Sequence, residues 1–217
     1  MDVCHVDEVG FSPTLVPNYT WGERGARVEV PYEAPAGRRI NAIGAYFTDG
    51  PRAGHFVYDT WARLPTSRAK KPRKTVAEIA AAHGLTAAEV GVLDGERFVR
   101  FIWTLAGRPA TAGPEWRRER PVWVVLDNYS VHKSGRVAQE QADWQAAGIE
   151  LVYLPAYSPK LSKIEPVWND VKHHQMPVRS YPQAADLKRA VEEALAHKAD
   201  RLRATATKPT NLSQAAT

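Results

Sequence analysis

Three acidic residues in this sequence stand in contexts that suit the binding of a catalytic divalent metal. Asp7 lies in CHVDEVGFSP, Asp127 directly follows the apolar run VWVVL, and Glu165 lies in LSKIEPVWND. Mg²⁺ is a hard cation, and proteins usually hold it with one or two carboxylates plus substrate phosphates. Two such ions about 3.5–4 Å apart can activate water and stabilise the leaving oxygen in phosphodiester cleavage. Three carboxylates brought together would suit that chemistry, which needs no nucleophilic Ser or Cys.

Asp127 is the most informative of the three. The unbroken apolar run Val122–Leu126 predicts a buried strand, and the strand ends in Asp127 and Asn128. Ligands bind outside the carboxyl ends of strands in open α/β sheets. A first strand is predicted over Val3–Val6, with Asp7 at or near its end. If these two strands are neighbours, both aspartates lie at one sheet edge, within a few ångströms of each other.

Glu165 has two interpretations. Ser162 followed three residues later by Glu165 matches a capping box, in which the carboxylate would only cap a helix predicted over about Lys163–His174. At about 100° per residue, however, Glu165 lies at the border of the apolar stripe of this helix, with Lys172 on its own face. A border carboxylate can lean toward the sheet edge. Together with the two aspartates, this position favours a site residue.

The order of the remaining elements predicts an α/β fold, with a mixed sheet and helices on its faces. Strands come first along the chain, and strands and helices alternate later. The expected strands are Arg27–Pro31, Ile40–Phe47, Val57–Tyr58 and Glu150–Leu154, and the expected helices include Glu96–Ala106 and Ser134–Ala147. Glu8, next to Asp7, is expected to point to the opposite face of its strand and to be structural.

Length and composition favour one folded domain with a short appendage. The chain has 217 residues, 44% of them hydrophobic, and Cys4 is its single cysteine, which excludes an internal disulfide and a thiolate zinc cage. No apolar run approaches the roughly 18 residues of a membrane span, so we expect a soluble intracellular protein. We divide the chain into a catalytic domain over residues 1–175, with a helical insertion at about 60–110, and a C-terminal helix and frayed tail over 176–217.

A basic stretch interrupted by prolines precedes the insertion. It carries no acidic residue between Thr60 and Thr75, and its cations include Lys70, Lys71, Arg73 and Lys74. Such a loop can follow a phosphate backbone, although it can equally be a solvated surface loop. The following segment, Val76–Leu93, has the rhythm of two short helices around Gly84. It lacks Arg and Lys in the second of them, which favours a packing hairpin over a DNA-reading helix-turn-helix.

These motifs resemble a known family. LDNYSVHKS followed by LPAYSPKLSKIEPVWNDVK closely resembles the catalytic core of the IS630 and Tc1/mariner transposases, a DDE superfamily with an RNase H-like fold. DEVGFSP, TWGERG and RRINAIGAYF fit the same family in the same order, so the resemblance covers roughly Val3 to Lys172. It implies an RNase H-like mixed sheet flanked by helices, with Asp7, Asp127 and Glu165 as the metal-binding catalytic triad.

By this resemblance the chain is the catalytic domain of a transposase, which would cleave DNA at transposon ends and join the 3′-OH to target DNA. It would use Mg²⁺ or Mn²⁺, as two ions, and act as a homo-oligomer or with a partner that carries helix-turn-helix domains. The family has such domains ahead of the first Asp, whereas this sequence begins six residues before it. The missing part is then encoded separately, or the chain is a truncated remnant. The family also implies a prokaryotic, nucleoid-associated protein of the cytoplasm.

Further residues of the motifs are candidates for substrate contacts. Asn128 can position a metal-bound water, His132 can contact the scissile phosphate, and Lys172 can follow Glu165 to the site. For Asn128 and His132 a loop-forming hydrogen bond is an equal alternative. Ser162 and Lys163 stand where the family usually has Asn-Pro. Two rival functions remain: an RNase H-like nuclease without strand transfer, and an inactive remnant that only binds DNA.

Overall fold

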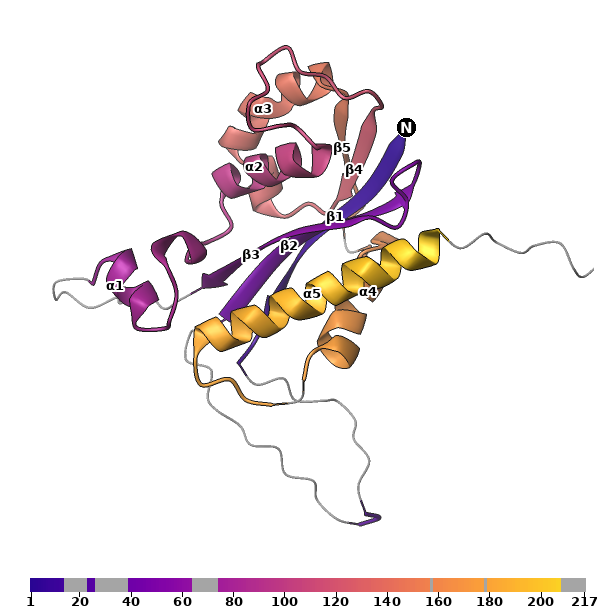
Figure 1. Cartoon of the computed structure of the whole chain (residues 1–217). Coiled ribbons are helices and arrows are strands. Elements are labelled where there is room, and N and C mark those ends of the chain that lie inside the picture. Colours follow the sequence, from indigo (N-terminus) through magenta and orange to yellow (C-terminus); the bar gives the residue numbers. More distant parts are fainter. Residues whose placement is uncertain (14–22, 26–38, 64–73, 157, 178, 208–217) are drawn as a thin grey trace, which may run out of the picture.

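The computed structural model describes residues 1–13, 23–25, 39–63, 74–156, 158–177 and 179–207. Within them, five strands form one mixed sheet in the order β3-β2-β1-β4-β5 (Figure 1). The pairs β1–β2 and β2–β3 are antiparallel, and β4 and β5 continue the sheet in parallel with β1. The strands are β1 (Asp2–Phe11), β2 (Arg39–Asp49), β3 (Phe56–Arg63), β4 (Val122–Leu126) and β5 (Ile149–Tyr153).

Helices cover both faces of the sheet. The described helices are α1 (Val76–Ala81), α2 (Gly95–Ala106), α3 (Gly135–Ala146), α4 (Glu165–Asp170) and α5 (Ala184–Ala206). A π-helical turn, Val171–Gln175, continues α4, and short 3₁₀ turns lie at Ala87–Glu89, Ser130–Lys133 and Pro159–Leu161. In Figure 1, α4 and α5 lie on one side of the sheet and α2 and α3 on the other. No described helix has the length and apolarity that a membrane crossing needs.

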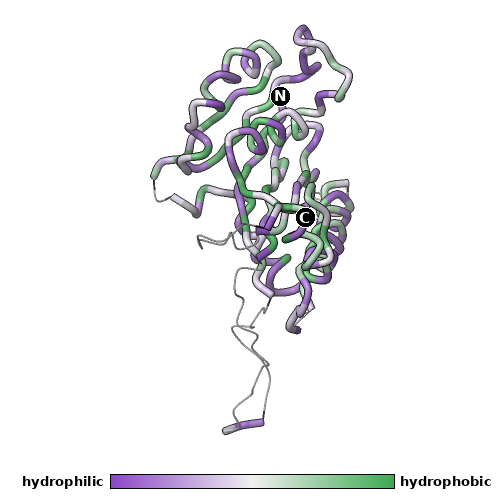
Figure 2. The backbone as a smooth tube through the Cα atoms, turned by 90° about the vertical axis from the view of Figure 1, so that its left-hand side faces the viewer, coloured by the Kyte–Doolittle hydropathy of each residue, from purple (hydrophilic) through white to green (hydrophobic). Residues whose placement is uncertain are grey.

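Alternating side chains along β1 divide the interior into two cores. Val9 and Phe11 pack with α4 and α5, whereas Cys4 and Val6 pack with α2 and α3. Successive strand residues point to opposite faces, so Asp7 shares the face of α4 and α5, and its neighbour Glu8 the face of α2 and α3. Figure 2 shows hydrophobic and hydrophilic stretches alternating along the helices, as expected of elements with one buried side.

The parallel pairing of β1 with β4 brings the two aspartates level. His5 pairs with Val125, so two residues further along each strand Asp7 and Asp127 stand at the same height (5 + 2 = 7 and 125 + 2 = 127). β4 ends at Leu126, and Asp127 is therefore the first residue beyond the ladder. The prediction that these strands are neighbours is confirmed.

Most predicted elements near the site are present, with two corrections. β1 is longer than the predicted Val3–Val6, because β2 pairs with it as far as Phe11 opposite Ile40. Asp7 consequently lies within the strand and not at its end. The second correction concerns the segment around Gly84, where the expected second helix is only a three-residue 3₁₀ turn. The strand predicted over Arg27–Pro31 lies outside the described residues.

The segment around Gly84 packs as a hairpin. Ala80 and Leu85 are buried in the core that α5 completes, and the N–H of Ala185 donates to the carbonyl of His83. Gly84 itself has φ +70°, a conformation that favours glycine. A second helix of a single turn, fixed against α5, is too short to act as a recognition helix. The structure therefore supports the packing interpretation of this segment.

Gly44 allows α4 to approach the sheet beside Asp7. It is the β2 partner of Asp7, and a Cβ at this position would lie 2.5 Å from the Trp168 ring and 2.8 Å from Phe56. Trp168 belongs to α4 and packs edge-on against Phe56, with ring centroids 5.4 Å apart. The missing side chain at Gly44 thus sets the spacing between the sheet and the helix that begins at Glu165.

We therefore expect Gly44→Ala to destabilise the protein by about 1–3 kcal/mol, since an added methyl group overpacks this contact. Denaturant unfolding of both proteins measures the difference. Gly135→Ala is the matched control, because no atom lies within 4 Å of a Cβ built at Gly135, and alanine is favoured in a helix by roughly 0.5–1 kcal/mol. Equal stability of Gly44→Ala and the wild type would contradict the close approach of α4.

Candidate active site

Asp7, Asp127 and Glu165 line one pocket of about 490 Å³. β1 supplies Asp7, the end of β4 supplies Asp127, and the first residue of α4 supplies Glu165. Asp7 is partly buried, whereas Asp127 and Glu165 are exposed to solvent. The loop after β5 closes the remaining side of the pocket with Leu154 and Ala156. The three carboxylates predicted from the sequence therefore surround a common space.

The environment of Asp7 shows that the carboxylates interact. Burial raises the pKa of Asp7 to about 7, and the negative charges of Glu8, Glu165 and Asp127 add to this rise. A hydrogen bond from the backbone of Glu8 acts in the opposite direction. Near neutral pH the Asp7 carboxyl therefore carries a proton in a large fraction of the molecules, and a cation in the pocket would favour its ionised form.

The three side chains face the pocket without forming a finished ligand set. Among the described residues, no three Asp, Glu, His or Cys side chains stand together as a group that could hold a metal ion. Repulsion between like charges opposes a closer approach of the carboxylates. Their all-oxygen donor set nevertheless fits a hard divalent cation, which keeps several waters and binds only one or two carboxylates directly.

Glu165 does not serve in the predicted capping box. Helix α4 begins at Glu165 itself, with Ile164 as the N-cap and no side-chain cap, so Ser162 lies too early to act. The N–H groups of Val167 and Trp168 donate to the carbonyl of Ile164. The capping interpretation was wrong, because the chain enters the helix through a turn that displaces Ser162 from the first N–H groups. The Glu165 carboxylate remains free to face the pocket, and a carboxylate in the first turn is favoured by the helix dipole.

Lys172 interacts electrostatically with two of the carboxylates, although it does not line their pocket. Its side chain is half-buried on the π-helical turn after α4. Burial lowers the pKa of Lys172, and the charge of Arg39 lowers it further, while the charges of Glu165 and Asp7 act in the opposite direction. The negative charges of both carboxylates therefore favour the protonated form of the Lys172 ammonium group.

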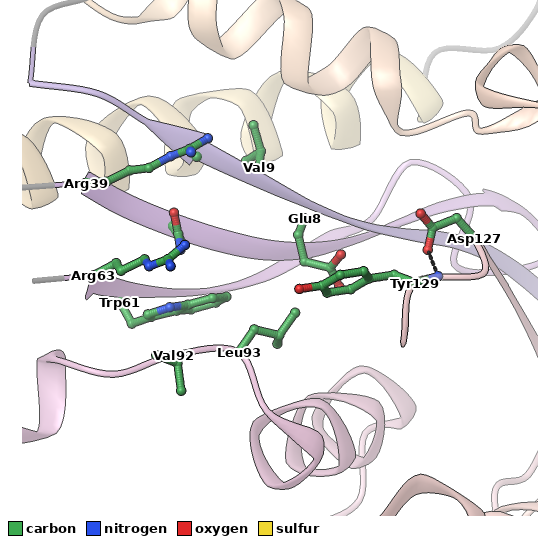
Figure 3. Close-up of a pocket in the computed structure, with 11 residues that line it drawn as sticks. Glu8, Val9, Arg39, Trp61, Arg63, Val92, Leu93, Asp127 and Tyr129 are labelled. Carbon is green, nitrogen blue, oxygen red and sulfur yellow. Dashed lines mark hydrogen bonds between the residues drawn. The ribbon is translucent and has the colours of Figure 1, made fainter. Parts of the chain in front are cut away.

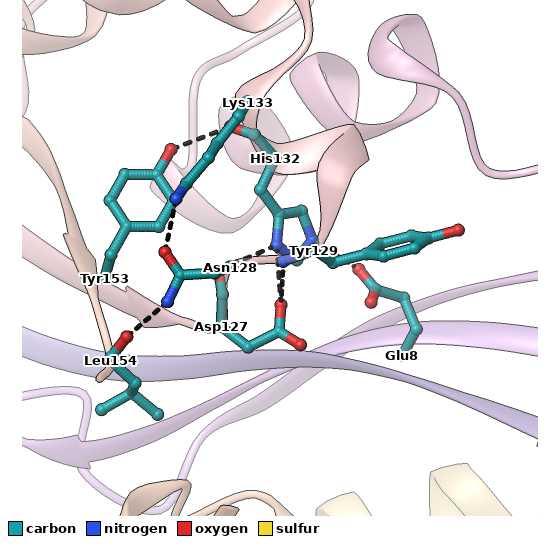
Figure 4. Close-up of polar contacts among 8 residues, drawn as sticks. All are labelled: Glu8, Asp127, Asn128, Tyr129, His132, Lys133, Tyr153 and Leu154. Carbon is teal, nitrogen blue, oxygen red and sulfur yellow. Dashed lines mark hydrogen bonds and ion pairs between the residues drawn. The ribbon is translucent and has the colours of Figure 1, made fainter. Parts of the chain in front are cut away.

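His132 links Asp127 to Glu8 beneath the surface. It is fully buried, with Nε2 2.9 Å from a Glu8 oxygen and Nδ1 3.1 Å from a carboxylate oxygen of Asp127 (Figure 4). Its ring stacks against Phe98 with centroids 4.5 Å apart. Burial alone would lower the pKa of His132, but the hydrogen bond to Glu8 and the nearby carboxylates leave it above its usual value.

The surroundings of His132 decide between its two interpretations. With both ring nitrogens engaged and no exposed surface, the structure favours the loop-forming role over contact with a scissile phosphate. The imidazole holds the carboxylate of Asp127 at the end of β4. Glu8, placed on this face by strand alternation as predicted, orients the imidazole from the other side.

Asn128 likewise joins the loop after β4 to β5. Its amide nitrogen donates to the carbonyl of Leu154 at 2.6 Å, and its amide oxygen accepts from Lys133 (Figure 4). The Tyr153 hydroxyl donates to the carbonyl of His132 at 2.8 Å. Asn128 also lines the pocket, although its side chain is committed to the loop. Sequence reasoning missed Lys133 and Tyr153, and only their adjacency to the motif and to β5 could have pointed to them.

The basic stretch is only partly described. Lys70, Lys71 and Arg73 lie outside the described residues, and Lys74 is exposed immediately before α1. The positive charge of Lys74 contributes to lowering the pKa of Glu78, after the hydrogen bonds from Thr75. The phosphate-binding interpretation of this stretch stays a prediction.

A family model decides the relationship of the chain to known proteins. The model of the DDE superfamily endonucleases matches residues 63–188, more than half of the sequence. The chain belongs to this family. The matched DDE endonuclease segment contains Asp127 and Glu165, whereas Asp7 precedes it, so the place of Asp7 in the site rests on the geometry of β1. Comparison with curated protein sequences gives no match.

Solved structures show the fold of this DDE endonuclease chain in other proteins. The Mos1 strand transfer complex matches with a TM-score of 0.54 and 12% identity, over 95% of this chain and 55% of that one. A Mos1 transposase paired-end complex with the left transposon end matches with a TM-score of 0.50 and 15% identity, over 92% of this chain and 52% of that one. The predicted RNase H-like mixed sheet flanked by helices is confirmed. The chain spans about half the length of these structures.

Asp7→Asn should stabilise the protein at alkaline pH. The folded pKa of about 7 exceeds the usual 3.8, so the folded state binds the proton more tightly than the unfolded chain. This tighter binding of the proton stabilises the folded state fully below about pH 4, and the stabilisation is lost as the pH rises through 7. Asparagine has no charge to lose, and above pH 7 we expect a gain of roughly 1–3 kcal/mol, reduced by partial exposure.

Denaturant midpoints of Asp7→Asn and the wild type at pH 4.5, 6 and 8 test this expectation, with the exposed Asp200→Asn as control. The gain of the Asp7 variant should grow with pH, while the control should show none. A gain that is the same at all three pH values would contradict the raised pKa.

Proposed function

We propose that this chain is the catalytic domain of a DDE transposase of the IS630 and Tc1/mariner group. It would cleave phosphodiesters at transposon ends and join the freed 3′-OH to target DNA. The observation that carries the proposal is the single pocket shared by Asp7, Asp127 and Glu165, in a chain of the DDE endonuclease family. The catalytic domain comprises residues 1–175, and helix α5 of the C-terminal part, 176–217, packs onto its core.

The three carboxylates are the residues that would hold Mg²⁺ or Mn²⁺, as a pair of ions. When bound, such ions supply activation of water and stabilisation of the leaving oxygen. Support comes from the donor set, which consists only of oxygens, and from a matching Mos1 mariner paired-end complex with Mn, at a TM-score of 0.50 and 14% identity. Asp7, whose carboxyl is protonated in part near neutral pH, would have to release that proton to serve as a ligand.

The other residues of the site position these carboxylates and the phosphate. His132 and Glu8 hold Asp127 in place at the end of β4. Lys172, beside Asp7 and Glu165, can donate to an oxygen of the scissile phosphate as negative charge develops there. In the hydrolytic step, water adds to phosphorus and the 3′-oxygen leaves with a proton. In the joining step, that 3′-OH takes the place of water.

DNA is the proposed partner. The matching Mos1 structures are a paired-end complex with a transposon end and a strand transfer complex. Lys70, Lys71, Arg73 and Lys74 form a basic stretch suited to phosphate contacts, and Asn128 borders the pocket at the loop after β4. We further propose that the chain acts as a homo-oligomer or with a partner that carries helix-turn-helix domains.

A nuclease without strand transfer is the main rival, and a DNA-binding remnant the second. These hypotheses can be distinguished by supplying a pre-cleaved DNA end, which has a free 3′-OH, together with a target plasmid. Only a transposase joins this end to the plasmid, a nuclease degrades DNA without joining, and a remnant does neither.

Asp127→Asn, Asp7→Asn and Glu165→Gln should each lower metal-dependent DNA cleavage by about 100-fold or more, because each removes a ligand worth several kcal/mol in the transition state. Cleavage of a labelled duplex in millimolar Mn²⁺ measures this loss, and Asp200→Asn should retain wild-type activity. In the same buffer, Mn²⁺ should raise the melting temperature of the wild type but not that of Asp127→Asn, since the ion binds the folded state.

Full cleavage by Asp127→Asn would remove this residue from the site. A metal-induced melting shift that persists in Asp127→Asn would place the bound ion elsewhere.

Replacement of Lys70, Lys71, Arg73 and Lys74 by Ala should weaken binding to unrelated duplexes by similar factors, because phosphate contacts carry no sequence information. Each lost contact should reduce the slope of log K against log salt by about 0.9. Titrations at several salt concentrations measure both quantities. Unchanged affinity and slope would identify the stretch as a solvated surface loop.

A further inference from the structure

A second pocket lies on the other side of Asp127. It has a volume of about 420 Å³ and is bordered by the far ends of β2 and β3, by Glu8 of β1 and by the turn after β4. Asp127 and Tyr129 line this pocket as well as the carboxylate pocket. A chain-like ligand that leaves the carboxylates at Asp127 can therefore continue directly into it. Figure 3 shows Asp127 and Tyr129 at one end and Arg39 and Arg63 at the other.

The far end of this pocket carries two arginines at directly paired strand positions. Arg39 begins β2, Arg63 ends β3, and the two residues are cross-strand partners. The Arg39 guanidinium extends over Gly10 of β1, on the side of β2 that faces away from Arg63 of β3. Across the described part of the chain, neither guanidinium forms an ion pair with a carboxylate, and both side chains are exposed. An anion that reaches both arginines would be attracted by two charges that have no carboxylate partner among the described residues.

The neighbouring strand leaves room for one of these arginines. Gly10 of β1 lies beneath Arg39, and a Cβ at Gly10 would come within 1.8–2.2 Å of the guanidinium atoms. The bare backbone of Gly10 therefore allows the guanidinium to lie flat over β1, at the edge of the pocket. A side chain at this position would displace the arginine without removing its charge.

Trp61 adds an unused hydrogen-bond donor. Its side chain is 1% exposed and lines the pocket, and its indole Nε1 has no hydrogen-bond partner among the described residues. A buried donor without a partner is costly, and because this nitrogen has almost no accessible surface, a ligand oxygen would reach it only if the ring moved. The guanidinium of Arg97 stacks over the same ring at 4.7 Å, and its charge is paired with Asp59 at 2.6 Å.

We infer that this second pocket binds backbone phosphates of the DNA strand that passes the carboxylates. The inference rests on the proposed function, because it assigns the path of that substrate. Arginine suits phosphate through paired N–H donors. Arg39 lies five positions before Gly44, the partner of Asp7, along β2, which is about 17 Å of strand. The phosphate between the arginines thus lies several nucleotides from the scissile one.

The two ends of the pocket also differ in charge. Near Asp127, Glu8 is paired with His132 at 2.9 Å, so its negative charge is offset there. The arginines at the other end face solvent without such a partner among the described residues. The strand would therefore meet the carboxylates at the cleavage position and the guanidinium groups further along. This arrangement favours a polyanion that is long enough to reach from the carboxylates to the guanidinium groups.

The experiment compares Arg39→Gln, Arg63→Gln and the double variant with Arg117→Gln, which removes the same charge on the loop before β4, at the opposite end of the parallel strands. Binding of labelled DNA is measured across salt concentrations without added metal. Each pocket arginine should contribute about tenfold to affinity, and the double variant should lower the salt slope by about 1–2. Arg117→Gln should have a much smaller effect.

Two further variants separate a binding role from a folding role. Arg63→Gln removes an exposed charge that has no ion-pair partner among the described residues, so its melting temperature should stay close to that of the wild type even as its affinity falls. Gly10→Ala keeps both charges but displaces Arg39, and it should weaken binding as Arg39→Gln does. A loss of affinity that appears only together with a loss of folding would overturn the inference.

The substrate provides the sharpest test. A methylphosphonate removes the charge of one phosphate, and a scan along the strand should find a position several nucleotides from the cleavage site where the substitution weakens binding to the wild type but not to the double variant. Equal effects at every position on both proteins would overturn the phosphate site while wild-type cleavage still supported the transposase. A wild type that shows this position but never cleaves DNA would leave the site standing and contradict the proposed function.

Discussion

The parallel pairing of β1 with β4 is the constraint on which the site depends. It fixes Asp7 and Asp127 at one height, because a ladder of backbone hydrogen bonds allows no sliding without moving every side chain to the other face. Both carboxylates can then face one pocket. Gly44 transmits the same constraint to α4, since its missing side chain lets Trp168 pack on the sheet and brings Glu165 to the pocket.

Placing Asp7 in this arrangement costs free energy when its carboxyl group ionises. Asp7 is partly buried beside other carboxylates, and its pKa of about 7 expresses the work of ionising it there. The pKa of His132 is raised as well, in this case because two carboxylates favour its charged form despite full burial. Both groups lose stabilising free energy as the pH rises, so the folded state is least favoured where the carboxylates are best ionised for a cation. Such local strain is characteristic of functional sites.

The turn after β4 connects the two faces of the molecule. Asp127 borders the pocket of Glu165 and also the pocket of Arg39 and Arg63, while its side chain is anchored from below by His132. β1 runs on beyond the end of β4, so its last residues have no parallel neighbour on that side. A substrate can pass around this edge from one pocket to the other.

Local patterns in the sequence predicted the strand Val122–Leu126, the strand Ile40–Phe47, the long helix α2 and the three acidic residues, because apolar periodicity and strand ends are written in neighbouring residues. The same patterns failed at Ser162, whose capping box is overridden by a turn, and at the length of β1, which depends on pairing with a strand some thirty residues away. Only tertiary structure decided that His132 is buried between Glu8 and Asp127, since these partners lie 124 and 5 residues from it. Only tertiary structure, likewise, paired Arg39 with Arg63 and left the indole N–H of Trp61 without a hydrogen-bond partner among the described residues, because sheet register and burial arise from contacts that no local stretch of sequence contains.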